Sequence, residues 1–365
     1  MTVRVLVVDD SFFFRNRIKQ ILSSHPCISV VGSANNGEEA VAKAKQLRPD
    51  VITMDVEMPK MDGITALKII MAESPCQVVM LSSLTRRSAS VTLEALALGA
   101  VDYMEKDAQA WVSGPSSADV GQIATLLTDK ILALGRGRTR PVLTSTLRIR
   151  ESAAHTPLNV VKNSRLKRAD SHIRVPACDI VTVGASTGGP AALQFILTKI
   201  PANFPVPILL TQHMPKAFTS VFAKRLDDLS LIRIKEAENG DQLMPGHAYL
   251  APGGQQMIID PSNHRQLLIR ESDQRMTYKP SVDLTFASVA KGYGKRALGI
   301  VMTGMGADGC DGARVLKKTG ATIWAQDKES CTIFGMPKAV IQAELADAVI
   351  NLETLKELFE HWGPR

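Results

Sequence analysis

The sequence of 365 residues contains no apolar run close to the roughly 18 to 20 residues that a membrane-spanning helix needs. Its beginning also lacks the layout of a signal peptide, because Asp9 and Asp10 interrupt the first apolar run. Only five cysteines are present, and none of them forms a CxxC pair or another metal-binding spacing. An odd number of scattered cysteines suits a reducing compartment. We therefore expect a cytoplasmic protein without membrane insertion.

The net charge of +7 is concentrated in one segment. Between Gly135 and Pro176 there are ten Lys and Arg residues and only two acidic ones, so the rest of the chain is close to neutral. This segment has no periodic apolar pattern, and it has no interleaved aromatic residues that would stack on bases. We expect a flexible basic linker over residues 135–176 and no binding of nucleic acid.

On both sides of this linker, short apolar runs alternate with stretches in which apolar residues recur every three or four positions. In the first half, the strand-like runs are Val3 to Val8, Ile28 to Gly32, Val51 to Asp55, Val78 to Ser82 and Val101 to Met104. The helix-like stretches are Phe13 to Leu22, Gly37 to Leu47, Gly63 to Met71, Ser88 to Leu98 and Val120 to Leu134. Such alternation predicts an α/β fold, with a doubly wound parallel sheet in residues 1–134.

The second half, residues 177–365, repeats this alternation and is predicted to form a second doubly wound parallel sheet. Its middle is rich in Gly and Pro. Three short strand candidates there predict an antiparallel excursion from the sheet: Ala248 to Leu250, Met257 to Ile259 and Leu267 to Ile269. Further strands are expected at Thr322 to Ala325 and Ala348 to Ile350, followed by a last helix from Leu352 to Phe359.

Three apolar runs of the second half each lead into a group that acyl transfer needs. The run from Asp179 reaches Ser186, the run from Pro207 reaches His213, and the run from Ala297 leads to Asp308. The carboxyl ends of neighbouring parallel strands meet at one edge of a sheet, so a hydroxyl, an imidazole and a carboxylate would converge there. This is the set that a serine hydrolase requires, with Ser186 as nucleophile, His213 as base and Asp308 as its orienting acid.

Other assignments of these residues remain open at this point. His247 is a rival base, and Asp311 and Asp283 are rival acids. Glycines around Ser186 also suit phosphate or dinucleotide binding, but the GxGxxG spacing is missing and no acid ends the next strand to bind a ribose. A non-enzymatic output domain is the competing class, although no helix-turn-helix-like basic reader is present.

Polar residues also follow the strands of the first half. Asp9 and Asp10 come after the first strand, Asp55 ends the third, Ser82 ends the fourth, and Lys106 follows the fifth. Clustered carboxylates repel one another unless a hard cation lies among them, and oxygen ligands suit Mg²⁺. A carboxylate beside Mg²⁺ can accept a phosphoryl group, with the serine hydroxyl and the lysine nearby.

These residues make the first 106 positions similar to a response-regulator receiver domain. The matching motifs are the acidic pair, the stretch from Asp55 to Gly63, Ser82, Tyr103 and Lys106. The resemblance implies phosphorylation of Asp55 by a histidine kinase. It also implies Mg²⁺ held by Asp10, Asp55 and the backbone carbonyl of Glu57, with Asp9 in support, and a switch made of Ser82, Tyr103 and Lys106. One departure is Asp107, where the family usually has proline.

Residues 178 to 351 resemble the catalytic domain of the chemotaxis protein-glutamate methylesterases, the CheB family. The motifs that carry the resemblance are Gly184 to Gly189, Thr211 to Pro215, Pro245 to Tyr249, Pro280 to Asp283, Thr303 to Gly309 and Phe334 to Pro337. The family's catalytic triad falls on Ser186, His213 and Asp308. Its active-site surroundings fall on Thr187, Met305 and Gly306, where backbone amides would bind the oxyanion.

The resemblance implies a phosphorylation-activated enzyme that hydrolyses glutamate methyl esters on methyl-accepting chemotaxis receptors, releasing methanol, and that also deamidates glutamine. The implied phosphodonor is the histidine kinase CheA. Mg²⁺ is implied at the phosphorylation site, and no cofactor is implied for the esterase reaction.

Overall fold

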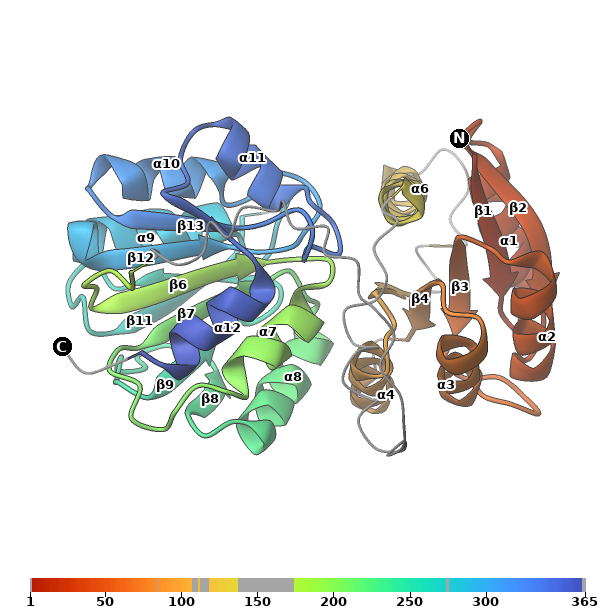
Figure 1. Ribbon diagram of the computed structural model, residues 1–365, viewed down its shortest axis with the longest axis horizontal. Coiled ribbons are helices and arrows are strands. Elements are labelled where there is room, and N and C mark those ends of the chain that lie inside the picture. Colours follow the sequence, from red (N-terminus) through yellow and green to blue (C-terminus); the bar gives the residue numbers. More distant parts are fainter. Residues whose placement is uncertain are drawn as a thin grey trace, which may run out of the picture.

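Two parallel sheets with helices on both faces, together with a small two-stranded antiparallel sheet, make up the computed structural model (Figure 1). The structure describes residues 2–83, 85–106, 111, 118–136, 174–273 and 276–362. Most of the expected linker, residues 137–173, and Asp107 therefore lie outside the described residues. The prediction of two doubly wound α/β units is confirmed.

The first sheet has five parallel strands in the order β2-β1-β3-β4-β5. Their bounds are Val3–Val8 (β1), Ile28–Ala34 (β2), Val51–Asp55 (β3), Gln77–Ser82 (β4) and Asp102–Glu105 (β5). The helices are Phe12–Ser23 (α1), Gly37–Leu47 (α2), Gly63–Glu73 (α3), Arg86–Ala97 (α4) and Ala118–Arg136 (α6). Strand order reverses at β1 and β3, so a ligand-binding crevice is expected at their carboxyl ends.

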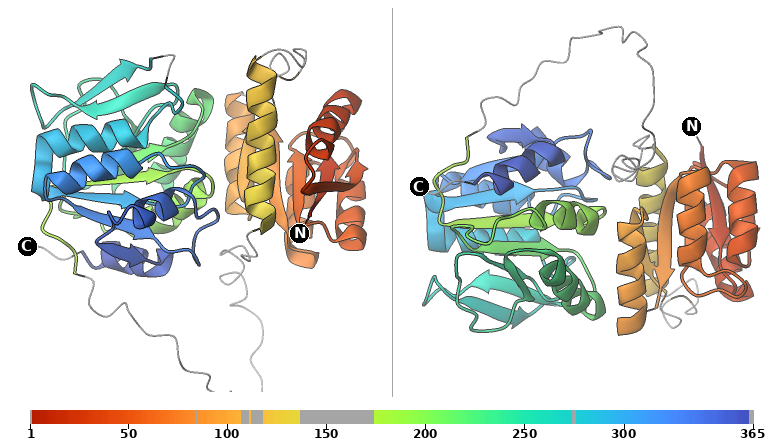
Figure 2. Two further views of the ribbon diagram at one scale, coloured as in Figure 1. Left: turned by 90° about the horizontal axis from the view of Figure 1, so that it is seen from above. Right: turned by 60° about the horizontal axis from the view of Figure 1, so that its bottom comes forward.

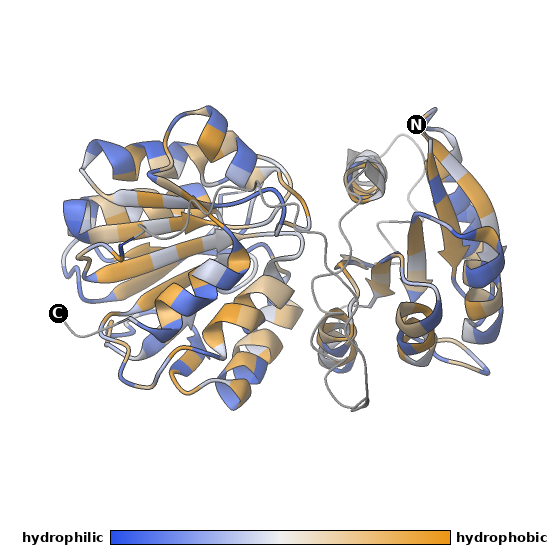
Figure 3. Ribbon diagram, viewed as in Figure 1, coloured by the Kyte–Doolittle hydropathy of each residue, from blue (hydrophilic) through white to orange (hydrophobic). Residues whose placement is uncertain are grey.

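Alternate residues of β1 contact helices on opposite faces of this sheet. Val5 and Val7 pack with α1 and α6, whereas Leu6 and Val8 point into the cluster that contains α2, α3 and α4. Because side chains of successive strand residues point to opposite faces, a strand covered on both sides must be apolar throughout. That requirement explains the continuous run from Val5 to Val8, and Figure 3 shows the same hydrophobic character in the strands of both sheets.

The second sheet has seven parallel strands in the order β14-β13-β12-β6-β7-β9-β8. The strand bounds are Ile180–Ala185 (β6), Ile208–Gln212 (β7), Arg233–Glu236 (β8), His247–Leu250 (β9), Ala297–Val301 (β12), Thr322–Gln326 (β13) and Ala348–Ile350 (β14). The helices are Gly189–Leu197 (α7), Lys216–Leu229 (α8), Val282–Tyr293 (α9), Cys310–Lys318 (α10), Met336–Gln342 (α11) and Leu352–Glu360 (α12), with a short 3-10 turn at Gly294–Arg296 (η3). Residues of α9, α10 and α11 pack on one face, and residues of α7, α8 and α12 pack on the other.

The predicted antiparallel excursion exists, but it is smaller than expected. Gln255–Ile259 (β10) and Leu267–Glu271 (β11) pair antiparallel and form a separate two-stranded sheet. Assigning Ala248 to Leu250 to this excursion was wrong, because that segment pairs in parallel with both β7 and β8. β8 went unpredicted because only Ile234 in it is buried, which leaves little apolar signal.

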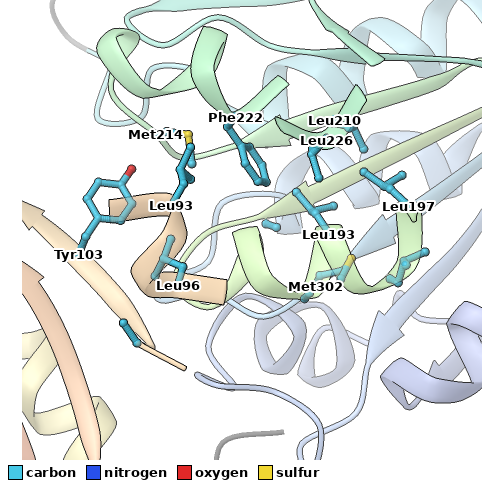
Figure 4. Packing of buried hydrophobic residues seen from close by; sticks show 14 of the residues in the cluster. Leu93, Leu96, Tyr103, Leu193, Leu197, Leu210, Met214, Phe222, Leu226 and Met302 are labelled. Atoms are coloured by element: carbon cyan, nitrogen blue, oxygen red, sulfur yellow. The ribbon is translucent and has the colours of Figure 1, made fainter. Parts of the chain in front are cut away.

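The two units lie side by side, with α4 and α6 on the side of the first unit that faces the second (Figure 2). Leu93 and Leu96 of α4 share one buried cluster with Leu193 of α7 and Phe222 of α8 (Figure 4). Tyr103 stacks on Phe218 with ring centroids 4.7 Å apart. No helix among the described residues is long and apolar enough to cross a membrane.

An aromatic cluster closes the second unit at its carboxyl end. Phe204 stacks on Phe359 of α12 at 5.6 Å, and Trp362 meets both rings edge-on. Phe359 is buried. We expect Phe359→Ala to lower the free energy of unfolding by about 3–5 kcal/mol, because it leaves a cavity where the ring was. Urea unfolding measures this loss.

The control for that variant is Leu229→Ala, which removes a half-exposed side chain at the end of α8. It should change the free energy of unfolding by no more than about 0.5 kcal/mol. Equal effects of the two substitutions would contradict the packing described for α12.

Candidate active site

Ser186 lies on a tight turn between β6 and α7. Its backbone N–H donates to Thr303 O at 3.0 Å, and its carbonyl accepts from Gly189 N at 2.8 Å. Gly188 has φ +77°, and a Cβ there would lie 2.3 Å from Thr332 Oγ1. Only glycine fits such a left-handed, crowded position at no steric cost. The turn therefore presents Ser186 at the amino end of α7.

His213 follows β7 directly beside this turn. Ala185 is paired with Gln212 across the two strands, so Ser186 and His213 are the next residues on each. The side-chain amide of Gln212 donates to Ser186 O at 3.0 Å and to His213 O at 3.1 Å. This one buried side chain thus ties the serine turn to the histidine, a role that the sequence analysis missed.

Asp308 reaches the same place from the loop after β12. Its Oδ2 lies 2.7 Å from His213 Nε2. Three donors at the start of α9 also bind this carboxylate. Val282 N donates to Oδ2 at 2.7 Å, and Ser281 Oγ and Asp283 N donate to Oδ1 at 3.0 Å each. Burial would raise the pKa of Asp308, but the hydrogen bond and charge of His213 and these backbone donors hold it below its usual value.

The three predicted residues are therefore brought to one edge of the sheet. Because Asp308 occupies Nε2 of His213, Nδ1 is the ring nitrogen left for a second partner. Within the described chain, no hydrogen bond joins the hydroxyl of Ser186 to the ring. In the absence of substrate this contact is often long or poorly aligned in enzymes that use it.

The rival residues lie in other environments. His247 begins β9, and the parallel register puts this end of β9 beside the start of β7, at the opposite edge of the sheet from Ser186. Asp311 is exposed and pairs with Arg314. Asp283 accepts from Gly309 N and Gly312 N at the start of α10, so it caps that helix instead of contacting His213.

Two of the three predicted active-site surroundings, Thr187 and Met305, contact the first unit. Thr187 donates its hydroxyl to Asp102 of β5 at 2.7 Å, and Lys130 of α6 pairs with the same carboxylate. Met305 packs against the cluster formed by α1, α6 and the first sheet. Gly306 has φ +86° and lies against the hydroxyl of Tyr278.

The acidic residues of the first unit also gather as predicted. Carboxylate oxygens of Asp9, Asp10 and Asp55 all lie within 4.8 Å of one another. Lys106 Nζ bridges two of them, at 2.9 Å from Asp9 and 2.5 Å from Asp55. Burial raises the pKa of Asp9, and it raises that of Asp55 to about 6 although the charge of Lys106 opposes it. The side chain of Glu57 is exposed and is not part of this cluster.

Of the three expected switch residues, Ser82 and Tyr103 are buried, and Lys106 is partly buried beside Asp9 and Asp55. Ser82, at the end of β4, accepts a hydrogen bond from Thr92 Oγ1 of α4 at 2.7 Å. Tyr103 lies in the contact with Phe218, so its ring is not free to rotate without disturbing that contact. Burial raises the pKa of Tyr103 well above its usual value, which keeps its hydroxyl neutral.

Comparison with known proteins identifies both units. Residues 181–359 match the family model for CheB methylesterase, and residues 5–111 match that for the response regulator receiver domain. A Pseudomonas putida protein named protein-glutamate methylesterase/protein-glutamine glutaminase of group 1 operon is 49% identical over 99% of both chains. The chain belongs to the CheB methylesterase family.

Two further similarities complete this comparison. The protein-glutamate methylesterase/protein-glutamine glutaminase of Idiomarina loihiensis is 46% identical over 97% of this chain and 96% of its own. The crystal structure of the Thermotoga maritima CheB methylesterase catalytic domain is 39% identical, with a TM-score of 0.49, and covers 52% of this chain and 100% of that one. Membership of the CheB family makes this chain a carboxylic ester hydrolase with a receiver domain.

The acidic cluster of this CheB chain has the chemistry of a Mg²⁺ site. Its donors are hard carboxylate oxygens of Asp9, Asp10 and Asp55, within 4.8 Å of one another. Three carboxylates this close repel one another, and the single charge of Lys106 beside Asp9 and Asp55 offsets only part of that repulsion. The residues present therefore fit the ion that a receiver domain implies.

The Asp283–Asp308 pair predicts a pH-dependent stability. Burial, together with the charge of Asp308, raises the pKa of Asp283 to about 6. In the unfolded chain Asp283 loses its proton at a pH near its ordinary pKa of about 4, whereas in the folded chain it keeps the proton until about pH 6. Its contribution to the free energy of unfolding therefore falls as pH rises from about 4 to 6. Asp283→Asn keeps an acceptor for Gly309 and Gly312 without the charge. We expect it to gain about 1 kcal/mol of stability over wild type between pH 4 and pH 7, after allowance for solvent screening.

Urea unfolding at the two pH values measures this difference. Asp311→Asn is the matched control, since it changes an exposed acid in α10, the helix that Asp283 caps, and should stay within about 0.5 kcal/mol of wild type at both. A difference between wild type and Asp283→Asn that does not grow with pH would contradict the burial of this carboxyl.

Proposed function

We propose that the chain is a cytoplasmic, phosphorylation-activated protein-glutamate methylesterase and glutaminase that acts on methyl-accepting chemotaxis receptors. The observation that carries this proposal is the 2.7 Å contact of His213 with Asp308 beside Ser186, at adjacent strand ends. The names of the full-length relatives support the substrate class. In this proposal residues 1–134 regulate, residues 177–365 catalyse, and residues 135–176 link the two.

The proposed chemistry is acyl transfer through Ser186. The hydroxyl attacks the side-chain carbonyl of a methylated glutamate while His213 takes its proton, and Asp308 stabilises the imidazolium. The proton then passes to the methoxide, methanol leaves, and the glutamyl group remains esterified to Ser186. Water attacks this ester by the same route and releases glutamate. With glutamine, ammonia is the leaving group.

The oxyanion of each tetrahedral intermediate needs donors that are already in place. We assign this role to backbone amides around Thr187, Met305 and Gly306, at the amino end of α7 and the loop after β12. Support comes from the turn itself, because Thr303 Oγ1 donates to Thr187 O at 2.9 Å and so fixes the neighbour of the nucleophile. Preorganised donors of this kind are often the largest single contribution to acyl-transfer catalysis.

Regulation is assigned to the acidic cluster. Asp55 would accept a phosphoryl group from a histidine kinase, CheA in this family. Asp10, Asp55 and the Glu57 carbonyl would hold Mg²⁺, with Asp9 in support, and the bound ion would offset the charge on the phosphate oxygens. Lys106 would pair with the phosphate, and Ser82 and Tyr103 would move in response to it. Because Tyr103 touches Phe218, such a movement would loosen the contact with the catalytic unit.

The first test removes the nucleophile. Ser186→Ala should lower methanol release from methylated receptor membranes by at least about a thousandfold, because it removes the hydroxyl to which the proposal assigns the attack on the ester. Ser262→Ala, an exposed serine of the loop between β10 and β11, is the control and should retain full activity. Substantial esterase activity in Ser186→Ala would exclude the proposed mechanism.

The second test weakens the contact between the units. Phe218→Leu keeps an apolar side chain but removes the ring stacked on Tyr103. An aromatic pair contributes enough free energy to shift the equilibrium between the docked and undocked regulatory unit. Activity of the unphosphorylated variant should therefore rise about two- to tenfold. Methanol release before and after adding a small phosphodonor measures the change, and the phosphodonor should stimulate the variant less than wild type.

Phe286→Leu is the control for this variant, because Phe286 is equally buried but lies in α9, away from the first unit. It should leave the stimulation by phosphodonor unchanged. Lower unphosphorylated activity in Phe218→Leu than in wild type would contradict inhibition through this contact.

A further inference from the structure

Tyr278 lies flat against the ring of His213. The two ring centroids are 4.3 Å apart and the planes differ by 7°. Tyr278 belongs to the segment between β11 and α9, outside every strand end from which the catalytic residues come. Its hydroxyl lies at Gly306, since a Cβ there would be 2.7 Å from Tyr278 Oη. The phenol thus contacts both His213, through its ring, and the loop that carries Asp308, through its hydroxyl.

Hydrogen bonds from the antiparallel pair β10–β11 fix the position of Tyr278. Gln256 of β10 is buried, and its amide donates to Tyr278 O at 2.9 Å and accepts from Ser281 N at 2.8 Å. Gly254 N adds a hydrogen bond to Lys279 O at 3.1 Å. Ser281 in turn donates to Asp308. The Gln256 amide therefore orients two groups at once: the Tyr278 ring, which lies over His213, and the start of α9, which binds Asp308.

We infer that Tyr278 is a positioning residue that acts through His213, an inference that rests on the function proposed above. Its ring limits rotation of the imidazole, so that Nε2 stays on Asp308 and Nδ1 faces the nucleophile. The ring face also attracts the positive charge that His213 acquires when it takes the proton of Ser186. Burial and the nearby charges of Asp308 and Asp283 raise the pKa of Tyr278, so the phenol stays neutral.

This role predicts a specific kinetic pattern. The imidazolium exists only after proton transfer, so loss of the ring should slow the chemical step and leave substrate binding unchanged. Tyr278→Leu should lower kcat for methanol release about tenfold while KM stays within about twofold. Tyr278→Phe keeps the ring and should restore kcat to within about twofold of wild type.

The assay uses the full chain with Mg²⁺ and a small phosphodonor, and it also measures the rate at which a fluorophosphonate modifies Ser186. Tyr293→Leu is the matched control, because Tyr293 is another partly buried tyrosine but bonds to His264 O at the far end of α9. It should leave both rates unchanged. Tyr278→Met provides a second non-aromatic variant should Tyr278→Leu fail to fold.

The outcomes separate this inference from the function on which it rests. Wild-type rates in Tyr278→Leu, or a Tyr278→Phe variant as slow as Tyr278→Leu, would overturn the role of the ring and leave the proposed function intact. A wild-type chain that neither releases methanol nor reacts with the fluorophosphonate at Ser186 would overturn both.

Discussion

The hydrogen bond between Asp308 and His213 is the constraint on which the rest of the site depends. A carboxylate this deeply buried is costly unless its lone pairs are used, and here the start of α9 supplies N–H and O–H donors while the imidazole takes the remaining direction. Asp308 lies seven residues beyond β12, and the donors at the start of α9 fix its carboxylate beside His213. The acid is therefore held both by the loop after β12 and by the start of α9.

The sheets and the residues at strand ends could be predicted from sequence because they depend on local signals. A strand buried on both faces must be apolar, and parallel pairing carries its last residue to a common edge, so Ser186, His213 and the acidic pair Asp9 and Asp10 were recognisable. The Gly-rich motifs and the resemblance to the CheB family identified the chemistry. The acid was harder to assign, because Asp283, Asp308 and Asp311 all lie near helix starts and spacing alone does not rank them.

What the sequence did not reveal are contacts that only the assembled chain makes. Gln212 and Gln256 are buried amides whose partners lie far away in sequence, and no periodicity marks them. Tyr278 is a partly buried aromatic in an irregular segment, where a lone tyrosine carries no signal of its role. The strand from His247 was misassigned because short strands between glycines look alike whether their partner runs parallel or antiparallel. Each miss concerns a long-range partner that tertiary packing selects.

The hydrogen bond from Thr187 to Asp102 has a thermodynamic consequence. It joins the residue after the nucleophile to the residue before Tyr103, so a receptor segment seated on Ser186 and a docked regulatory unit exclude each other under the proposed regulation. Linkage between binding equilibria is reciprocal. Whatever free energy phosphorylation contributes to substrate affinity, bound receptor must contribute equally to the phosphorylated form at equilibrium. Abundant methylated receptor would then favour the same undocked arrangement that phosphorylation favours.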